Sequence, residues 1–180
     1  MIKVLMIPGP RYHAQQFCNM IKNNRKALYV SADSGNVDGE EPQADNDLLI
    51  LEMRPDGGPC DYGADIVIAA DGAAPADRLP GGCIKKGAML IFDPGSTDQC
   101  ALISALDLTP VTCGTGEKNT ISVSSVQDNA IVLTVGRDVP NLYGKTIEVQ
   151  DHIFRGEQHD VRSAVLACAL LLLTEEREAI

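Results

Sequence analysis

Short apolar runs alternate with helical patterns through the first two-thirds of the chain. Five of these runs are continuous and apolar, the pattern typical of strands that are buried on both faces of a sheet. They cover Lys3–Ile7, Ala27–Ser31, Leu48–Glu52, Ile66–Ala70 and Ala88–Phe92. This alternation predicts an α/β fold with a mostly parallel, P-loop or Rossmann-like sheet.

Two segments between the strands have helical periodicity. In His13–Asn23 the apolar residues Phe17, Met20 and Ile21 recur at three and four residues, which places them on one face of a helix. Ser96–Leu106 repeats the pattern, with Ser96 suited to cap its start. We expect both helices to cover the sheet.

The last third of the chain has a different pattern. Thr120–Val126 and Ala130–Val135 are rich in β-branched residues and predict a hairpin, and Lys145–Val149 predicts a third strand of a small appended antiparallel sheet. His159–Leu173 is apolar nearly all round and predicts a buried helix, followed by the solvated tail 174–180. No repeat or linker divides residues 1–180, which predicts a single domain.

Composition excludes several classes of protein. The 180 residues are 44% hydrophobic and carry a net charge of −10, so the chain is neither disordered nor suited to bind nucleic acid or anionic lipid. The longest apolar run, Ala164–Leu173, is too short to span a membrane. The N-terminus lacks the cleavage site of a signal peptide, and we expect a cytoplasmic protein.

The positions of the cysteines in the sequence predict that they are free thiols, in a protein of a reducing compartment. No C-x-x-C pair is present, so neither a zinc site nor a thioredoxin-like site is indicated. Two of the six, Cys18 and Cys168, fall in predicted helices where partial burial is expected. The others are Cys60, Cys83, Cys100 and Cys113.

The first candidate site is the turn between the first strand and the first helix. Such turns bind phosphate in nucleotide-binding α/β proteins, because backbone N–H groups converge there. Gly9, Arg11 and His13 are suited to bind an anion, but Pro8 and Pro10 lack N–H donors. A tight structural turn is the alternative.

Further polar residues follow other strands at the same predicted edge of the sheet. Glu52 is placed to hold a metal or a hydroxyl, or simply to pair with Arg54. The loops at 71–77 and 93–96 would share this crevice, although Asp93 is better explained as a turn-forming residue than as a ligand. His159, Asp160 and Arg162 begin the last helix, where catalysis and helix capping are alternatives. No hydrolase or metalloprotease motif is present.

The order of these segments resembles the central ATP-binding domain of the Mur ligase family, the enzymes that add amino acids to the peptidoglycan precursor. Val111–Gly116 is similar to the family's V-T-Y-G segment, with a hairpin behind it. The run from His159 to Ala164 is similar to the family's H-N-V-x-N-A helix start, with Asp160 and Ser163 in place of Asn.

The resemblance implies a degenerate nucleotide site. Gly9 matches the first glycine of the family's G-T-x-G-K-T-T loop, but Tyr12 stands at the second glycine, His13 at the phosphate-binding lysine and Ala14 at the magnesium-binding hydroxyl. Glu52 matches the family's magnesium-binding glutamate. The resemblance therefore implies loss of the ATP chemistry, with no cofactor expected and ATP with magnesium only if the loop still binds them.

The leading hypothesis is a stand-alone Mur-ligase-like domain without ligase activity, because the loop lacks the family's lysine, hydroxyl and second glycine and we expect no flanking domains. It would act as a nucleotide-binding, anion-binding or regulatory module linked to cell-wall synthesis. One alternative is a small enzyme acting on an anionic metabolite, and another is a homo-oligomeric interaction protein or one that binds a protein partner. The candidate binding residues are Gly9, Arg11, Tyr12, His13, Glu52, Asp93 and His159.

Overall fold

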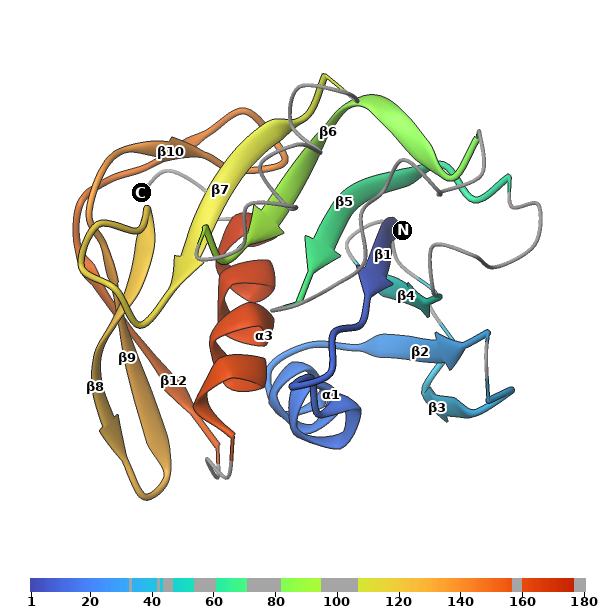
Figure 1. Ribbon diagram of the computed structural model, residues 1–180, viewed down its shortest axis with the longest axis horizontal. Coiled ribbons are helices and arrows are strands. Elements are labelled where there is room, and N and C mark those ends of the chain that lie inside the picture. The colour runs from blue at the N-terminus through green and yellow to red at the C-terminus, as the bar shows by residue number, and fades with distance from the viewer. Residues whose placement is uncertain are drawn as a thin grey trace.

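The computed structural model describes residues 1–32, 34–41, 43, 47–53, 61–70, 82–94, 107–156 and 160–176. These residues form one large sheet with two helices against it (Figure 1). Among them, no helix combines the length and the apolar character needed to cross a membrane.

The ten-stranded sheet has the order β12-β9-β8-β7-β6-β5-β1-β4-β2-β3. The strands from β2 across to β8 pair in parallel, whereas β3, β9 and β12 pair antiparallel with their neighbours. The parallel part comprises β1 (Ile2–Ile7), β2 (Ala27–Ser31), β4 (Leu48–Glu52), β5 (Ala64–Ala69), β6 (Ile84–Phe92), β7 (Thr109–Gly114) and β8 (Ile121–Gln127). The remaining strands of the sheet are β3 (Val37–Gly39), β9 (Ala130–Val135) and β12 (Asp151–Arg155). The predicted α/β class, with a mostly parallel sheet and a hairpin at one side, is confirmed.

The third antiparallel strand was predicted at the wrong place. Within Lys145–Val149 only β11 (Thr146–Ile147) is a strand, and it pairs with β10 (Val139–Pro140) in a separate two-stranded sheet. The strand that extends the hairpin is β12. Its two ends are charged and its apolar residues are few, so it lacks the continuous apolar run that identified the other strands.

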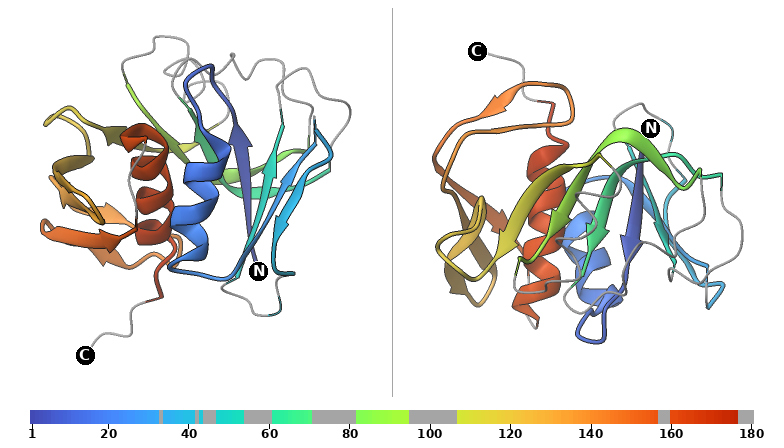
Figure 2. Two further views of the ribbon diagram at one scale, coloured as in Figure 1. Left: turned by 90° about the horizontal axis from the view of Figure 1, so that it is seen from below. Right: turned by 45° about the horizontal axis from the view of Figure 1, so that its top comes forward.

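Two helices lie side by side on one face of the sheet, as Figure 2 shows. α1 (Ala14–Lys22) buries Phe17, Met20 and Ile21 against it, as predicted. α3 (Val161–Leu173) is buried at every residue from Ser163 onward, which confirms the prediction of a helix that is apolar all round. The helix predicted at 96–106 lies outside the described residues.

The core is divided by the sheet, because successive side chains of a strand point to opposite faces. Val4 and Met6 of β1 pack with the helices, while Leu5 and Ile7 belong to a second cluster on the other face. Both clusters are buried.

The C-terminal end of α3 is closed by several polar contacts. The hydroxyl of Thr174 donates to the carbonyl of Leu170 at 2.8 Å, and Arg25 donates to the carbonyl of Thr174 at 2.8 Å. A cation at this end of a helix is favourable. Thr174 is fully buried, so the predicted solvated tail does not begin at this residue.

Four cysteines, Cys18, Cys83, Cys113 and Cys168, are buried free thiols in the described part of the chain. Cys18 and Cys168 lie on α1 and α3, as predicted. Cys60 and Cys100 lie outside the described residues.

Candidate functional site

The turn after β1 uses one of its backbone N–H groups within the turn itself, and two of its residues have no N–H group. Tyr12 donates its N–H to the carbonyl of Gly9 at 3.1 Å, and Pro8 and Pro10 have no N–H to donate. His13 occupies the N-cap position of α1 without a capping hydrogen bond from its side chain, and both His13 and Arg11 are exposed. These two candidates for anion binding therefore lie at the surface, while Tyr12 is half-buried.

The starts of α1 and α3 are joined through one buried serine. The backbone N–H of His13 donates to Oγ of Ser163 at 2.9 Å, and Ser163 is only 1% exposed. Its own N–H donates to Oδ2 of Asp160 at 3.0 Å, which is the N-cap contact of α3. The capping interpretation of Asp160 is confirmed, and His159 lies outside the described residues.

Glu52 lies in a cluster of hydroxyl groups where the carboxyl ends of β2 and β4 meet. Its Oε2 accepts a hydrogen bond from the hydroxyl of Tyr29, and its Oε1 accepts from Ser31 Oγ at 3.1 Å. The register makes this possible, because Ser31 is directly opposite Glu52 and Tyr29 is two residues earlier on the same face. The hydroxyl of Tyr12 lies 3.1 Å from that of Tyr29. The structure therefore brings Tyr12 and Glu52 into one cluster.

The aromatic rings of the cluster are packed against α1. Phe17 contacts Tyr12 edge-on with 5.8 Å between ring centroids, and its ring lies 6.3 Å from that of Tyr29. Burial, followed by the neighbouring Tyr29, raises the pKa of the Tyr12 hydroxyl above its usual range. Burial, followed by the hydrogen bond to Glu52, raises the pKa of Tyr29. Both phenols therefore keep their protons at neutral pH, which keeps Tyr29 a hydrogen-bond donor to the Glu52 side chain.

Asp93 has different neighbours. It follows β6 and lines a pocket of about 30 Å³ with Gly114 at the end of β7 and Arg162 of α3. A volume of this size holds about one water molecule. A Cβ atom on Gly114 would lie 3.2 Å from Oδ2 of Asp93, so a larger residue would crowd the carboxylate. Burial raises the pKa of the adjacent Cys113 thiol, with a further contribution from Asp93.

The loop at 71–77, Arg54 and Ser96 lie outside the described residues, so the predicted crevice shared by four loops is not described as a whole. That prediction placed Glu52 and Asp93 together, but the two residues have different neighbours. Glu52 contacts Tyr29 and Ser31, whereas Asp93 lines the small pocket beside β7 and α3. No group of three or more His, Cys, Asp or Glu residues suited to a metal ion is found in the described ranges.

Two polar residues of the site, Tyr29 and Ser31, were not among the sequence candidates, and Ser163 was named only as a departure from a family motif. The first two carried a signal, because they are the polar residues at alternate positions of an otherwise apolar strand and therefore share one face. The hydrogen bond between Ser163 and His13 had no such signal. It depends on the approach of α1, which lies 150 residues away in the sequence.

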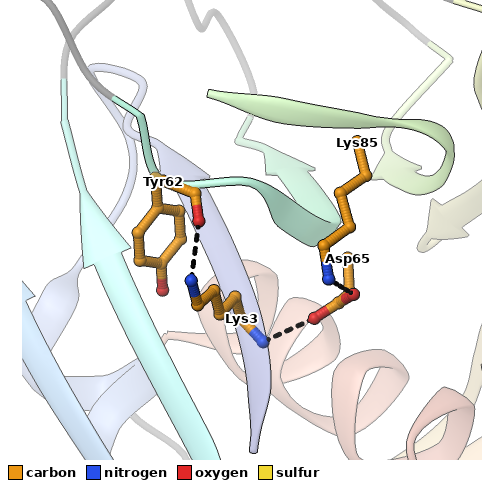
Figure 3. Close-up of polar contacts among 4 residues, drawn as sticks. All are labelled: Lys3, Tyr62, Asp65 and Lys85. Carbon is orange, nitrogen blue, oxygen red and sulfur yellow. Dashed lines mark hydrogen bonds and ion pairs between the residues drawn. The ribbon is translucent and has the colours of Figure 1, made fainter. Parts of the chain in front are cut away.

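A second polar cluster, in Figure 3, lies at the opposite end of the strands. The backbone N–H of Lys3 donates to Asp65 at 2.9 Å, and the ammonium group of Lys85 lies 2.5 Å from the same carboxylate. The ammonium group of Lys3 donates to the carbonyl of Tyr62 at 3.0 Å and lies over its ring. These contacts tie β1, β5 and β6 together, which is a structural role.

Comparison with known proteins identifies the fold. No protein-family model matches the chain, and no curated protein sequence matches it. Solved structures of Mur ligases do match it. A murein peptide ligase from Psychrobacter arcticus 273-4 superposes with a TM-score of 0.56 at 8% identity, over 95% of this chain and 43% of that one.

Two further ligases agree with this match. The UDP-N-acetylmuramate:L-alanyl-gamma-D-glutamyl-meso-diaminopimelate ligase from Neisseria meningitides gives a TM-score of 0.55 at 9% identity, over 96% of this chain and 60% of that one. MurF from Acinetobacter baumannii gives 0.51 at 11% identity, over 96% and 42%. The chain thus has a Mur-ligase-like α/β fold and spans roughly half the length of these enzymes.

Proposed function

We propose that this chain is a degenerate Mur-ligase-like domain that does not catalyse ATP-dependent ligation and acts as a binding or regulatory module linked to cell-wall synthesis. The observation that carries the proposal is the hydroxyl cluster around Glu52. Both oxygens of this carboxylate accept hydrogen bonds from β2, and Tyr12 adds a third hydroxyl to the cluster.

The residues present do not fit ATP with magnesium. Phosphoryl transfer requires a lysine and a metal ion to stabilise charge on the phosphates, and backbone N–H groups to hold them. By the resemblance, His13 and Ala14 replace the lysine and the metal-binding hydroxyl. The N–H of His13 already donates to Ser163, and the Glu52 carboxylate already has two donors. The chain therefore lacks the groups with which this loop would stabilise phosphoryl transfer.

The same turn is still suited to bind an anion, but more weakly than a complete phosphate-binding loop would. Arg11 and His13 are exposed beside the start of α1, where the helix dipole favours negative charge. The link to cell-wall synthesis rests on the fold, because the similar structures are ligases whose names specify murein peptide and UDP-N-acetylmuramate substrates. Fold alone does not fix function, so this link is part of the proposal.

The alternative of a small enzyme acting on an anionic metabolite needs His13, Glu52 and Asp93 in one place. Glu52 is engaged by Tyr29 and Ser31, whereas Asp93 lines the pocket beside β7 and α3. This division favours a binding module over the enzyme.

A thermal-shift titration tests the proposal, because a ligand that binds only the folded state raises its melting temperature. The ligands are ATP, ADP, UDP-sugars and inorganic phosphate, each with and without magnesium. We expect no magnesium-dependent shift with ATP, and we expect any shift with phosphate or a UDP-sugar to disappear in Arg11→Ala. A magnesium-dependent shift with ATP would refute the proposed loss of the ligase site.

A further inference from the structure

β12 is the outermost strand of the sheet, and no other strand in the described part of the chain pairs with its outer side. It is the last strand in the order and pairs with β9 on its other side (Figure 1). An exposed strand edge presents N–H and C=O groups that can pair with another chain.

The hydrogen bonds at the two ends of β12 show which residues face outward. Val135 donates to the carbonyl of Gln150 at 2.9 Å, and Gly156 donates to the carbonyl of Asn129 at 2.9 Å. Partners in an antiparallel ladder alternate, so His152 and Phe154 also direct their backbone groups toward β9. The backbone groups of Asp151, Ile153 and Arg155 are therefore directed away from the sheet.

The same three residues carry the exposed side chains of β12. His152 is buried and Phe154 half-buried, whereas Asp151, Ile153 and Arg155 are exposed. Ile153 is 70% exposed, more than any other large apolar side chain among the described residues. Arg155 makes no ion pair within the described part of the chain.

The order of these residues is self-complementary about Ile153. If β12 pairs antiparallel with β12 of a second copy about a two-fold axis at Ile153, each Ile153 lies opposite its equivalent. Asp151 of each copy then lies directly opposite Arg155 of the other. Opposite charges and apolar side chains at directly opposed positions stabilise antiparallel pairs, and a two-fold interface uses one patch on both copies.

We propose that the chain forms a homodimer through this antiparallel pairing of β12 with β12, which joins two sheets into one. The two Asp151–Arg155 pairs also fix the register, because a shift by two residues would separate them. They matter for a second reason, since two chains that each carry a net charge of −10 repel each other over most of their surface.

The described residues around β12 leave space for this partner. A groove of about 860 Å³ is lined by β12 and by residues at the C-terminal ends of α1 and α3. Its lining includes Arg25, Asp151, Ile153 and Glu175. The proposal does not depend on the cluster around Glu52, which lies where the carboxyl ends of β2 and β4 meet.

Sedimentation equilibrium on the full chain tests the dimer at about 1 to 500 µM protein, a range that covers weak to moderate affinities. The wild type should approach twice the chain mass of 19.2 kDa. Ile153→Lys and Arg155→Asp should each weaken dimerisation at least tenfold, because each places like charges opposite one another. The double variant Asp151→Arg with Arg155→Asp restores opposite charges and should return the dissociation constant to within about threefold of the wild type.

Val37→Lys is the matched control, because Val37 is 65% exposed on β3 at the other edge of the sheet. It should leave the mass unchanged, and circular dichroism should show that every variant is folded. The proposal is overturned if the wild type stays monomeric up to the highest concentration, or if Val37→Lys dissociates the dimer while Ile153→Lys does not. Failure of the charge-swapped double variant to dimerise would overturn the two-fold register.

Discussion

The hydroxyl of Tyr29 on β2 donates a hydrogen bond to the carboxylate of Glu52 on the neighbouring strand β4. Glu52 was expected, from sequence resemblance, at the position of a magnesium-binding glutamate, and the structure shows it accepting a hydrogen bond from a tyrosine side chain. Ser31 supplies a second donor, and Tyr12 adjoins Tyr29. The cluster therefore supplies hydrogen bonds from within the fold to both oxygens of this half-buried carboxylate.

Removing the Tyr29 hydroxyl should destabilise the fold. Tyr29→Phe keeps the ring but leaves Glu52 without one of its donors, and a hydrogen bond to a charged group contributes about 2 kcal/mol. We expect the free energy of unfolding in urea to fall by about this amount. Tyr143→Phe is the control, because Tyr143 is exposed and should change stability by less than about 0.5 kcal/mol. Equal stability of both variants would contradict the role of the cluster.

The hydrogen bond between His13 and Ser163, which joins the starts of α1 and α3, should contribute measurably to the free energy of unfolding. Ser163→Ala removes the acceptor of the His13 N–H, so the free energy of unfolding should fall by about 1 kcal/mol. Ser124→Ala, on the exposed face of β8, is the control and should be close to neutral. The account of this link is wrong if the two serine variants unfold at the same urea concentration.

The buried thiols should be protected from modification. Cys18, Cys83, Cys113 and Cys168 are buried, so at most two of the six cysteines should react with a thiol reagent in the folded protein at pH 8. All six should react in denaturant under reducing conditions. Rapid reaction of three or more thiols in the native state would contradict the described packing.

Stability should fall at alkaline pH partly because of Cys18. Burial, with a smaller contribution from Asp38, raises the pKa of this thiol from 9.0 to about 12. Between these values the unfolded chain loses the proton while the folded chain keeps it, so the free energy of unfolding decreases as pH rises. Cys18→Ala should show a shallower decrease between pH 9 and 12 in urea titrations. Parallel curves for the two proteins would rule out this contribution.

The sequence predicted the parallel part of the fold well, because β1, β2, β4, β5 and β6 are continuous apolar runs whose burial on both faces is evident in their composition. The sequence did not predict β7, because Pro110 interrupts its apolar pattern. It did not predict β12 either, because the charged residues Asp151 and Arg155 stand at the two ends of a strand whose residues alternate in exposure. Pairing with distant neighbours, rather than local pattern, makes both of them strands.

The candidate site was predictable only in part. Glu52 and the turn around Gly9 were found, because strand ends and glycines have local signals. The partners of Glu52 depend on the register between β2 and β4, and the contact of Ser163 depends on the packing of α1 against α3. Neither relationship is a property of a single segment.

Isothermal titration calorimetry of ATP with magnesium into the wild-type protein tests the central claim most directly. Glu52 is engaged by Tyr29 and Ser31, and His13 and Ala14 stand where the resemblance to Mur ligases implies a lysine and a hydroxyl. We therefore expect no binding up to about 1 mM ATP. The variant Tyr12→Gly, His13→Lys, Ala14→Thr restores the family's loop residues and should bind more tightly than the wild type. Magnesium-dependent binding of one ATP per wild-type chain would contradict the account.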